Sequence, residues 1–443
     1  MLAMETGVSA RSELLERMFQ ARQKSDALFQ LVRQRAIYDR PIPERHRIIF
    51  YLGHLEAFDW NLLHEHALGL SAFHPELDRL FAFGIDPVGG GLPSDQPSDW
   101  PPVSSVQDYV SGVRSALDSK LAAPTAETFA GRDGFSLDTL LHVAIEHRLM
   151  HLETLAYMLH QMPLGSKIPQ SDPPDQATSS YTDRMIEIPA GAITLGLPRG
   201  NPIFGWDNEY ESHSEKVPAF EIDQYQVTNG QFLDFIHGGG YGERSFWTDE
   251  NWKWKEEQGI SDPVFWKKAG DSWLYRTMFE EIQLPLDWPV YVSHAEASAY
   301  ARWVGKSLPT EGQWQRAAYA APDGREREYP WGNDAPAPRF GNFNFERWNP
   351  TPVNAHPAGA SAFGVQGMLG NGWEWTSTVF APFSGFEPFP FYRGYSADFF
   401  DGKHFVMKGG SARTAACMLR PTFRNWFQPR YQYVYAGFRC VSQ

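Results

Sequence analysis

Apolar residues recur at helical spacing in four stretches of the first part of the chain, and in each stretch they line one face of a predicted helix. The fourth stretch opens at Ser136, just after Gly134, which is a typical helix start. Four such helices predict an up-and-down bundle whose core holds ligands from facing helices. The stretches cover residues 10–37, 44–70, 104–122 and 136–161, to within a few residues.

The second and third predicted helices are separated by a loop, and the chain changes character after the fourth. Residues 86–93 are rich in Gly and Pro, a composition typical of a mouth or a lid. Residues 163–182 are polar and Pro-rich and predict a linker. Beyond it, short strand patterns alternate with Gly, Pro and Asn. Only two helical patterns stand out there, one over 228–237 and one over 293–304 that resumes at 311–319.

These patterns predict three parts and an α+β fold class. Residues 1–162 form a helical bundle, residues 163–182 a linker, and residues 183–443 a domain poor in regular structure. A chain of 443 residues is long enough for two or three domains. The aromatic content of 15% is concentrated in the second half, so we expect aromatic packing to hold that domain together.

Composition and charge exclude several functional classes. A net charge of −14 argues against nucleic acid or an anionic membrane as a partner, because both require a concentrated basic surface. No apolar run approaches the length of a membrane span, and the N-terminus lacks the pattern of a secretion signal, so we expect a cytoplasmic protein. The two cysteines, Cys417 and Cys440, cannot make a disulfide framework or a Cys-rich zinc site.

Three histidines indicate a metal site in the bundle. His147 and His151 are spaced i, i+4 on the fourth predicted helix, so both imidazoles leave one face about one turn apart. Leu140 and Val143 lie on the same side, where an unpartnered polar ring costs free energy. His54 on the second helix completes a triad of nitrogen ligands that suits Fe(II), Zn(II) or Cu(II) and leaves coordination positions open. Any one of the 14 histidines is more often an ordinary polar residue, and the i, i+4 spacing favours the metal interpretation here.

Two glutamates follow these histidines at a distance of two residues. Glu56 follows His54, and Glu153 follows His151. Carboxylates near metal-binding imidazoles often accept their second N–H group. Exposed helix carboxylates are the commoner explanation for glutamates of this kind, and both interpretations stay open here.

The second half of the chain carries seven ordered blocks. They are IPAG at 188–191, WPV at 288–290, LPTEGQW at 308–314, PWGN at 330–333, GNGWEW at 370–375, KGGS at 408–411 and GFRC at 437–440. With these blocks, the second half resembles the formylglycine-generating-enzyme (sulfatase-modifying factor) fold, a C-type-lectin-like variant. With a DinB-like four-helix bundle in front of it, and one histidine followed by an HxxxH pair, the whole chain resembles the non-haem iron sulfoxide synthases of ergothioneine and ovothiol biosynthesis. Selenoneine synthase belongs to the same group.

The resemblance implies an activity and a ligand set. Enzymes of this group use Fe(II) and O2 to couple a thiol or selenol donor to the imidazole ring of a histidine derivative. Their three iron ligands correspond to His54, His147 and His151. Zinc fits the same ligands but has no redox chemistry with O2, so the reaction requires iron.

The resemblance also implies a substrate pocket supplied by the second domain over the bundle. Residues 420–426 match the block that lines the pocket for hercynine, the betaine of histidine. Trp426 offers an aromatic face to the trimethylammonium group, and Asn425 offers its amide to the carboxylate. A phenol near the metal can donate a proton or an electron, and Tyr392 or Tyr395 lies in the corresponding stretch.

The departures from the family pattern concern the sulfur or selenium donor. Met150 stands where Gln is common, and Phe427 stands where an acidic residue is common, so γ-glutamylcysteine is a poor candidate. Cysteine would require a basic group for its carboxylate, from Arg413, Arg420 or Arg424. A selenosugar would need no charge clamp, and Met150 with Phe427 favours it slightly over cysteine.

Two other functions compete with this one: a formylglycine-generating oxidase and a lectin-like binding module. The copper-dependent oxidases need two nearby cysteines after the Gly-Gly-Ser block, and only Cys417 lies there, with Cys440 in the terminal strand. A binding module would not need three histidines in the bundle. The sequence therefore predicts an O2-dependent non-haem iron enzyme that attaches sulfur or selenium to hercynine.

Overall fold

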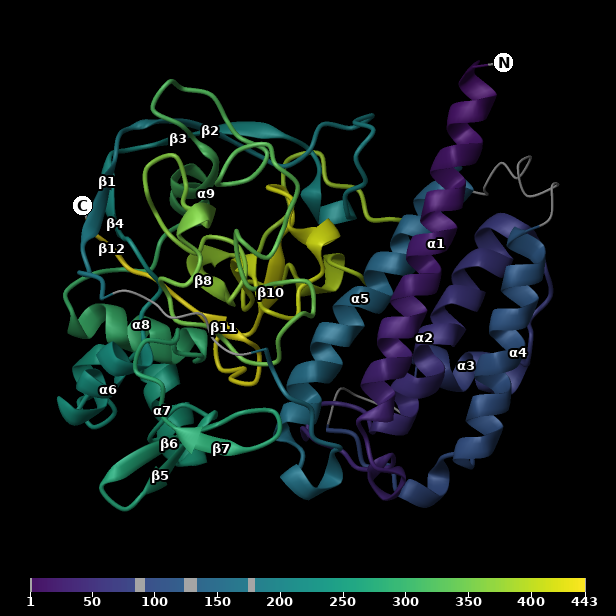
Figure 1. The fold of residues 1–443 in the computed structure, drawn as a ribbon, viewed down its shortest axis with the longest axis horizontal. Coiled ribbons are helices and arrows are strands. Elements are labelled where there is room, and N and C mark those ends of the chain that lie inside the picture. Colours follow the sequence, from purple (N-terminus) through teal and green to yellow (C-terminus); the bar gives the residue numbers. More distant parts are fainter. Residues whose placement is uncertain (1, 84–91, 123–133, 174–179, 443) are drawn as a thin grey trace. The chain divides into compact units, whose positions relative to one another are not determined.

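The computed structural model describes residues 2–83, 92–122, 134–173 and 180–442. The chain divides into two compact units, Met1–Gln170 and Ser171–Gln443 (Figure 1). Most of the predicted loop at 86–93 and part of the predicted linker lie outside the described residues. No helix in the described ranges is long and apolar enough to cross a membrane.

The first unit is helical, and its described residues form five α-helices where the sequence pattern predicted four. The additional helix is α3, which follows a π-helical turn that closes at Gly69 with a φ of 59°. α2 packs against α3, α4 and α5, while α1 packs against α5. The helices are α1 (Leu2–Gln30), α2 (Ile48–Leu63), α3 (Pro75–Phe83), α4 (Val103–Leu121) and α5 (Leu137–Gln161), and the short ones are η1 (Gln34–Ala36), η2 (His64–Leu68), η3 (Pro97–Asp99) and η6 (Leu164–Ser166).

α5 starts where the sequence predicts. The Ser136 hydroxyl accepts a hydrogen bond from the Thr139 backbone N–H at 3.1 Å, which caps one of the helix's first free donors. The apolar side chains of α5 are buried, and so are Glu146 and Arg148 in its middle. α5 is therefore surrounded by protein on several sides, which a stripe of apolar residues alone does not predict.

A buried charge network joins four helices of the first unit. Glu56 of α2 is 1% exposed and accepts hydrogen bonds from Arg148 of α5 at 3.0 Å and from Arg114 of α4 at 2.7 Å. The Arg22 guanidinium of α1 lies 3.9 Å from the same carboxylate, and Arg148 also donates to Asp59 at 2.6 Å. Burial alone raises the pKa of Glu56, but the three guanidinium groups outweigh it and lower the pKa to about 2.

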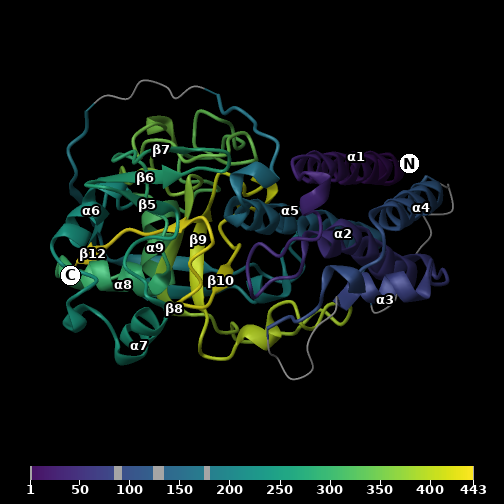
Figure 2. The ribbon, with the colours of Figure 1, turned by 90° about the horizontal axis from the view of Figure 1, so that it is seen from below.

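The second unit contains four small sheets among its described residues. The four-stranded sheet has the order β10-β9-β8-β11, and its strands β8, β9 and β10 lie side by side in Figure 2. Its strands are β8 (Gly372–Val379), β9 (Phe405–Gly410), β10 (Asn425–Phe427) and β11 (Ala436–Gly437). The other sheets are β1 (Met185–Ile188) with β4 (Phe220–Asp223) and β12 (Val441–Ser442), β2 (Gly191–Leu195) with β3 (His213–Val217), and β5 (Trp266–Ala269) with β6 (Ser272–Arg276) and β7 (Glu281–Gln283).

Three helices of this unit begin at the predicted places because each has a capping box. The N-cap residues are Thr228, Ser293 and Thr310, each bonded to the residue three positions on. The helix α7 escaped prediction because Trp252 and Trp254, two residues apart, point to different faces. The helices are α6 (Asn229–His237), α7 (Asp249–Gln258), α8 (His294–Trp303) and α9 (Glu311–Tyr319), with short ones η7 (Asp207–Glu209), η8 (Arg244–Phe246), η9 (Pro357–Gly359), η10 (Ala397–Phe399) and η11 (Ala416–Met418).

The GNGWEW block lies in the core of the second unit. Trp375 and Glu374 are fully buried on β8. The Glu374 carboxylate accepts hydrogen bonds from both Nε and Nη2 of Arg439 at 2.7 Å and from the Trp314 indole at 2.8 Å. A buried carboxylate with this many donors ties the last strands of the chain to the central sheet.

The charge network predicts a large stability loss when its carboxylate is neutralised. We expect Glu56→Gln to lower the free energy of unfolding by about 3 kcal/mol, because buried guanidinium groups then lose their counter-charge. Urea denaturation followed by circular dichroism measures this change. Glu13→Gln on the exposed face of α1 is the control and should change stability by less than about 0.5 kcal/mol. Equal stabilities of the two variants would contradict the role given to the network.

Candidate metal centre

The structure brings the three predicted histidines together inside the first unit. His54 lies on α2, and His147 and His151 lie on α5. One ligand nitrogen of each lies within 4.8 Å of the others, and the Nε2 atoms of His54 and His151 are 3.3 Å apart. Two nitrogens bound at right angles to one ion, each about 2.1 Å from it, are about 3 Å apart. The spacing therefore suits a shared metal ion.

Aromatic rings hold the imidazoles in place. The Phe58 ring stacks on His147 with centroids 3.4 Å apart and planes at 10°, and the Phe50 ring stacks on His54 at 4.7 Å and 27°. Both phenylalanines belong to α2, four residues on either side of His54, so they lie on the same helix face. These contacts restrict rotation of the rings and surround them with apolar surface.

Burial keeps all three imidazoles uncharged. Removal from water lowers the pKa of His54 to about 4, although the Phe81 carbonyl opposes part of the effect. The same removal from water, together with the neighbouring imidazoles, places the pKa of His147 and of His151 well below the usual value. A neutral imidazole carries the lone pair that a metal needs, so the ligands are ready at neutral pH without first losing protons.

The chemistry of the donor set fits a divalent transition metal. His54 and His147 are buried, and His151 is half-buried. The Nδ1 atom of His151 is buried and has no hydrogen-bond partner among the described residues. Three neutral nitrogen donors with no carboxylate among them are typical of sites for Fe(II), Zn(II) or Cu(II) and leave positions open for other ligands.

The outer partner of His54 is a backbone carbonyl and not a glutamate. The Nδ1–H of His54 donates to the Phe81 carbonyl at 2.7 Å. Both interpretations of Glu56, as a partner of His54 and as an exposed carboxylate, are wrong, because it is buried in the charge network. Glu153 is also buried, which rules out the exposed interpretation for it. Residues two apart on a helix face in different directions, so Glu56 points away from His54.

Two further residues, Arg45 before α2 and Tyr51 within it, lie close to the three histidines. The sequence pattern did not single them out. The positive charge of Arg45 is close enough to contribute to the lowered pKa of His151, and its guanidinium donates to the Tyr157 hydroxyl at 2.7 Å. The Tyr51 ring lies 5.8 Å from that of His151 and 6.5 Å from that of His54. Arg45 belongs to an irregular segment with no sequence pattern, so only the folded structure reveals that it lies close to His151.

In the second unit, Trp426 and the two tyrosines predicted as catalytic belong to one aromatic cluster. Trp426 lies on β10 and stacks on Phe380 with centroids 4.3 Å apart and planes at 6°. Tyr395 makes a T-shaped contact with Trp426 at 5.4 Å and stacks on Trp206 at 4.0 Å. Tyr392 contacts the same Trp206 at 6.4 Å. The cluster thus unites three side chains that the sequence predicted separately.

Comparisons with known proteins agree with this two-part organisation. Residues 169–443 match the sulfatase-modifying factor enzyme 1-like domain, and residues 18–155 match the DinB superfamily. The chain is 37% identical to a hercynine oxygenase of Mycobacterium tuberculosis, over 76% of this chain and 77% of that protein. It is 34% identical to a hercynine oxygenase of Mycolicibacterium thermoresistibile over 98% of this chain and 96% of that protein.

The chain belongs to the sulfoxide synthase family of ergothioneine biosynthesis. It is an oxidoreductase of that type, and the predicted family resemblance is confirmed. A fungal relative, the ergothioneine biosynthesis protein 1 of Neurospora crassa, is 28% identical over 93% of this chain but only 55% of its own length.

The two arginines assigned to the pocket are held in ion pairs within the second unit of the enzyme. Arg420 donates to Glu209 at 2.6 Å and 2.8 Å, and Arg424 donates to Glu311 at 2.9 Å and 3.1 Å. Arg424 is also only 2% exposed. Both arginines thus anchor the segment that leads into β10, and a role in donor binding stays a prediction.

The remaining predicted residues lie in less constrained surroundings. Asn425 accepts a hydrogen bond from the backbone N–H of Trp426 at 2.9 Å through its side-chain oxygen. Phe427 stacks on Tyr431 with centroids 5.1 Å apart. Met150 is half-buried on α5, one residue before His151. Substrate binding by these three residues stays a prediction.

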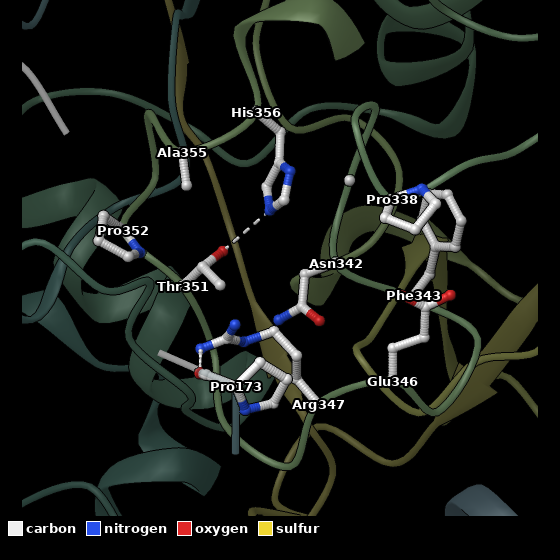
Figure 3. A pocket seen from close by; sticks show the side chains of 11 residues that line it. Pro173, Pro338, Asn342, Phe343, Glu346, Arg347, Thr351, Pro352, Ala355 and His356 are labelled. Atoms are coloured by element: carbon white, nitrogen blue, oxygen red, sulfur yellow. Dashed lines mark hydrogen bonds between the residues drawn. The ribbon is translucent and has the colours of Figure 1, made fainter. Parts of the chain in front are cut away.

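A separate cavity of about 220 Å³ lies in the second unit, and its lining holds none of the predicted site residues (Figure 3). His356 and Thr351 face each other across it, with Nε2 and Oγ1 3.4 Å apart. Arg347 donates to the Pro173 carbonyl at 2.7 Å along its lower edge. The cavity is therefore distinct from both the histidine triad and the Trp426 cluster.

The triad predicts that one histidine substitution removes bound metal. We expect His147→Ala to reduce metal content from about one equivalent to less than about a tenth, because two imidazoles bind far more weakly than three. Inductively coupled plasma mass spectrometry after loading with Fe(II) or Zn(II) measures it. His142→Ala on the same helix is the control and should retain the metal. Full metal content in the His147 variant would defeat the ligand assignment.

The depressed pKa values predict that protons compete weakly for the ligands. Histidines of ordinary pKa are largely protonated by pH 5.5, so an ordinary site would lose affinity steadily below pH 6.5. Because the pKa of His54 is about 4 and those of its partners are lowered too, metal affinity should stay nearly constant from pH 8 to about 5.5 and fall below that. Chelator competition with Zn(II) across this range tests it. A tenfold fall between pH 7.5 and 6 would contradict the expectation.

Proposed function

We propose that this enzyme uses Fe(II), held by His54, His147 and His151, and O2 to form a carbon–sulfur or carbon–selenium bond on the imidazole ring of hercynine. The observation that carries the proposal is the convergence of three neutral imidazoles, two buried and one half-buried, in a chain whose relatives are named hercynine oxygenase. Iron supplies the electron transfer to O2 that zinc lacks. The protein's part is to hold the ligands uncharged, to keep water from them and to place the substrate.

Hercynine binding is assigned to Trp426 and Asn425. A trimethylammonium group has no N–H to donate, so aromatic surface is its natural receptor. Phe380 stacks on one face of the Trp426 ring, and Tyr395 and Phe399 lie 5.4 Å and 5.7 Å from it. The cation is assigned to the opposite face, because the face of an aromatic ring attracts a cation and its edge does not. The Asn425 amide nitrogen is a donor suited to a carboxylate, and the side-chain oxygen of Asn425 is already used by the Trp426 N–H.

A tyrosine is assigned as the proton or electron donor of the reaction, and Tyr392 and Tyr395 are the candidates from sequence. Burial, followed by the nearby charge of Asp207, raises the pKa of Tyr392 to about 12, so its phenol stays protonated at neutral pH. Tyr51 in the first unit is a third candidate, because its ring lies 5.8 Å from that of His151. Separate Tyr→Phe variants distinguish the three, since only a donor's loss lowers kcat without a matching change in KM.

The donor best supported by the side chains is an uncharged selenosugar. A donor carboxylate would need a free guanidinium, yet Arg420 and Arg424 are engaged with Glu209 and Glu311. Arg413 is buried too and donates to the Phe345 carbonyl at 3.0 Å. Redirecting any of these arginines would leave a carboxylate or carbonyl without its donor, which costs free energy. Cysteine is the second candidate, and γ-glutamylcysteine is disfavoured.

The alternatives to a sulfoxide synthase lack support. No disulfide joins the two cysteines in the described structure, and Cys440 is fully buried with its thiol pKa raised by removal from water. A thiol in that state is a poor metal ligand or nucleophile. A formylglycine-generating oxidase that relies on a cysteine pair is therefore disfavoured.

The proposal is tested by supplying each donor separately. The enzyme is loaded with Fe(II) without oxygen, mixed with hercynine and a selenosugar, cysteine or γ-glutamylcysteine, and analysed by mass spectrometry after air is admitted. We expect a hercynine adduct with the selenosugar and little with γ-glutamylcysteine. A product with γ-glutamylcysteine alone would overturn the donor assignment, and no adduct with any donor would overturn the function.

Removal of the Trp426 ring should weaken hercynine binding more than it slows chemistry. We expect Trp426→Ala to raise the KM for hercynine about tenfold or more, because the cation loses an aromatic face worth about 1–2 kcal/mol. Steady-state kinetics with varied hercynine measure the change. Trp254→Ala, a half-buried tryptophan of α7, is the control and should leave KM unchanged. Equal KM values for both variants would remove Trp426 from the pocket.

A further inference from the structure

The helix α3 packs against α2 beside the metal centre. One of its backbone carbonyls, that of Phe81, contacts a ligand histidine. It accepts the Nδ1–H of His54 at 2.7 Å. A carbonyl can only accept, so the proton of the neutral His54 ring must sit on Nδ1.

That proton position decides which nitrogen of His54 faces the other ligands. With the proton on Nδ1, the lone pair is on Nε2, the atom that lies 3.3 Å from Nε2 of His151. An acceptor behind a metal-binding imidazole fixes its orientation and strengthens it as a ligand.

The distance between α3 and α2 is set by a glycine and an aromatic ring. Gly53, the residue before His54, is buried, and a Cβ added to it would lie 2.5 Å from the Phe81 ring. The ring is fully buried and has Tyr109 and Trp100 as aromatic neighbours, with centroids 5.8 Å and 6.4 Å away. It has no room to retreat, so only glycine at position 53 allows the observed approach.

α3 is also anchored independently of the metal centre. Asp78, one turn before Phe81, accepts hydrogen bonds from the Tyr109 hydroxyl at 2.7 Å and from the His74 backbone N–H at 3.0 Å. Asn61 of α2 donates to the Asp78 carbonyl at 3.2 Å. These bonds fix the helix on α4 and α2, which makes the Phe81 carbonyl a rigid support.

We propose that α3 is a positioning element of the metal centre, in which Phe81 holds His54 in the Nδ1–H form and Gly53 sets the distance of that support. Phe81 and Gly53 act through His54 and are positioning residues. The inference rests on the proposed function for the identity of the metal. It concerns ligand geometry, so it is measurable by metal binding alone.

The test is the metal affinity of Gly53→Ala, with Co(II) as the probe in chelator competition and its visible absorption as the record of ligand geometry. The added methyl pushes Phe81 and its carbonyl away from His54. We expect Co(II) affinity to fall about 10- to 100-fold and the absorption band to change. Alanine is the better helix former, so poor helix formation at position 53 would not explain a loss.

Gly112→Ala is the matched control. Its new Cβ would lie 2.6 Å from the far end of the Phe73 ring, which is 39% exposed and can move aside. The variant therefore adds the same methyl to a helix of the same bundle without displacing a buried ring. We expect it to retain Co(II) affinity within about twofold. Removing the ring as well, in Gly53→Ala with Phe81→Ala, makes room for the methyl while keeping the backbone carbonyl, so affinity should recover at least in part.

The outcomes of these experiments separate the possibilities. Wild-type affinity and spectrum in Gly53→Ala, or losses equal to those of Gly112→Ala, would overturn the inference. If Gly53→Ala fails to fold, Tyr109→Phe tests the same anchor, and unchanged Co(II) affinity in that variant would count against α3. Unchanged affinity in His54→Ala would overturn the proposed metal centre itself. Normal metal binding without a hercynine product would overturn only the proposed reaction.

Discussion

The packing of α2 against α5 is the contact on which the first unit depends. Each helix presents a histidine and a charged residue within two positions of each other, His54 with Glu56 on α2 and His147 with Arg148 on α5. Because nearby helix positions point in different directions, the imidazoles meet on one side of the contact while Glu56 and Arg148 meet on another. The ion pair fixes how the helices are rotated and shifted, and the same geometry fixes where the imidazoles meet.

The surroundings of the triad explain why a metal fits there. Uncharged imidazoles are favoured by burial, and the stacked rings of Phe50 and Phe58 limit their motion. Removing an imidazole nitrogen from water costs free energy unless another group binds its lone pair. One divalent ion would bind a nitrogen of each of the three histidines. Removal from water thus keeps the imidazoles uncharged and also favours their binding of a metal ion.

In the second unit, buried ion pairs between glutamates and arginines connect distant segments of the chain. Glu209, Glu311 and Glu374 are buried and paired with Arg420, Arg424 and Arg439 respectively. These pairs connect segments far apart in sequence in a unit whose sheets are small. They hold the stretch before β10 in one conformation, and so they fix Trp426 and its aromatic neighbours. The same pairing holds Arg420 and Arg424 in ion pairs within the unit.

Much of the site was readable from local patterns. The i, i+4 spacing of His147 and His151, the start of α5 at Ser136 and the three capping boxes of the second unit are short-range features, and the structure contains each of them. The family was identified from seven ordered blocks. Predictions failed where a long-range partner decides: α3 was missed, and the surroundings of Glu56 were misjudged, because its guanidinium partners come from three other helices.

By itself the sequence determined which side chains carry the chemistry and on which helices they stand, because helix periodicity and capping act over only a few residues. Tertiary structure decided which nitrogen of His54 is free, which carboxylates are buried and which arginines are engaged. Those properties depend on atoms brought together from distant parts of the chain, such as the Phe81 carbonyl at His54 and Glu209 at Arg420. No local pattern encodes such distances, since they follow from how complete helices and strands pack.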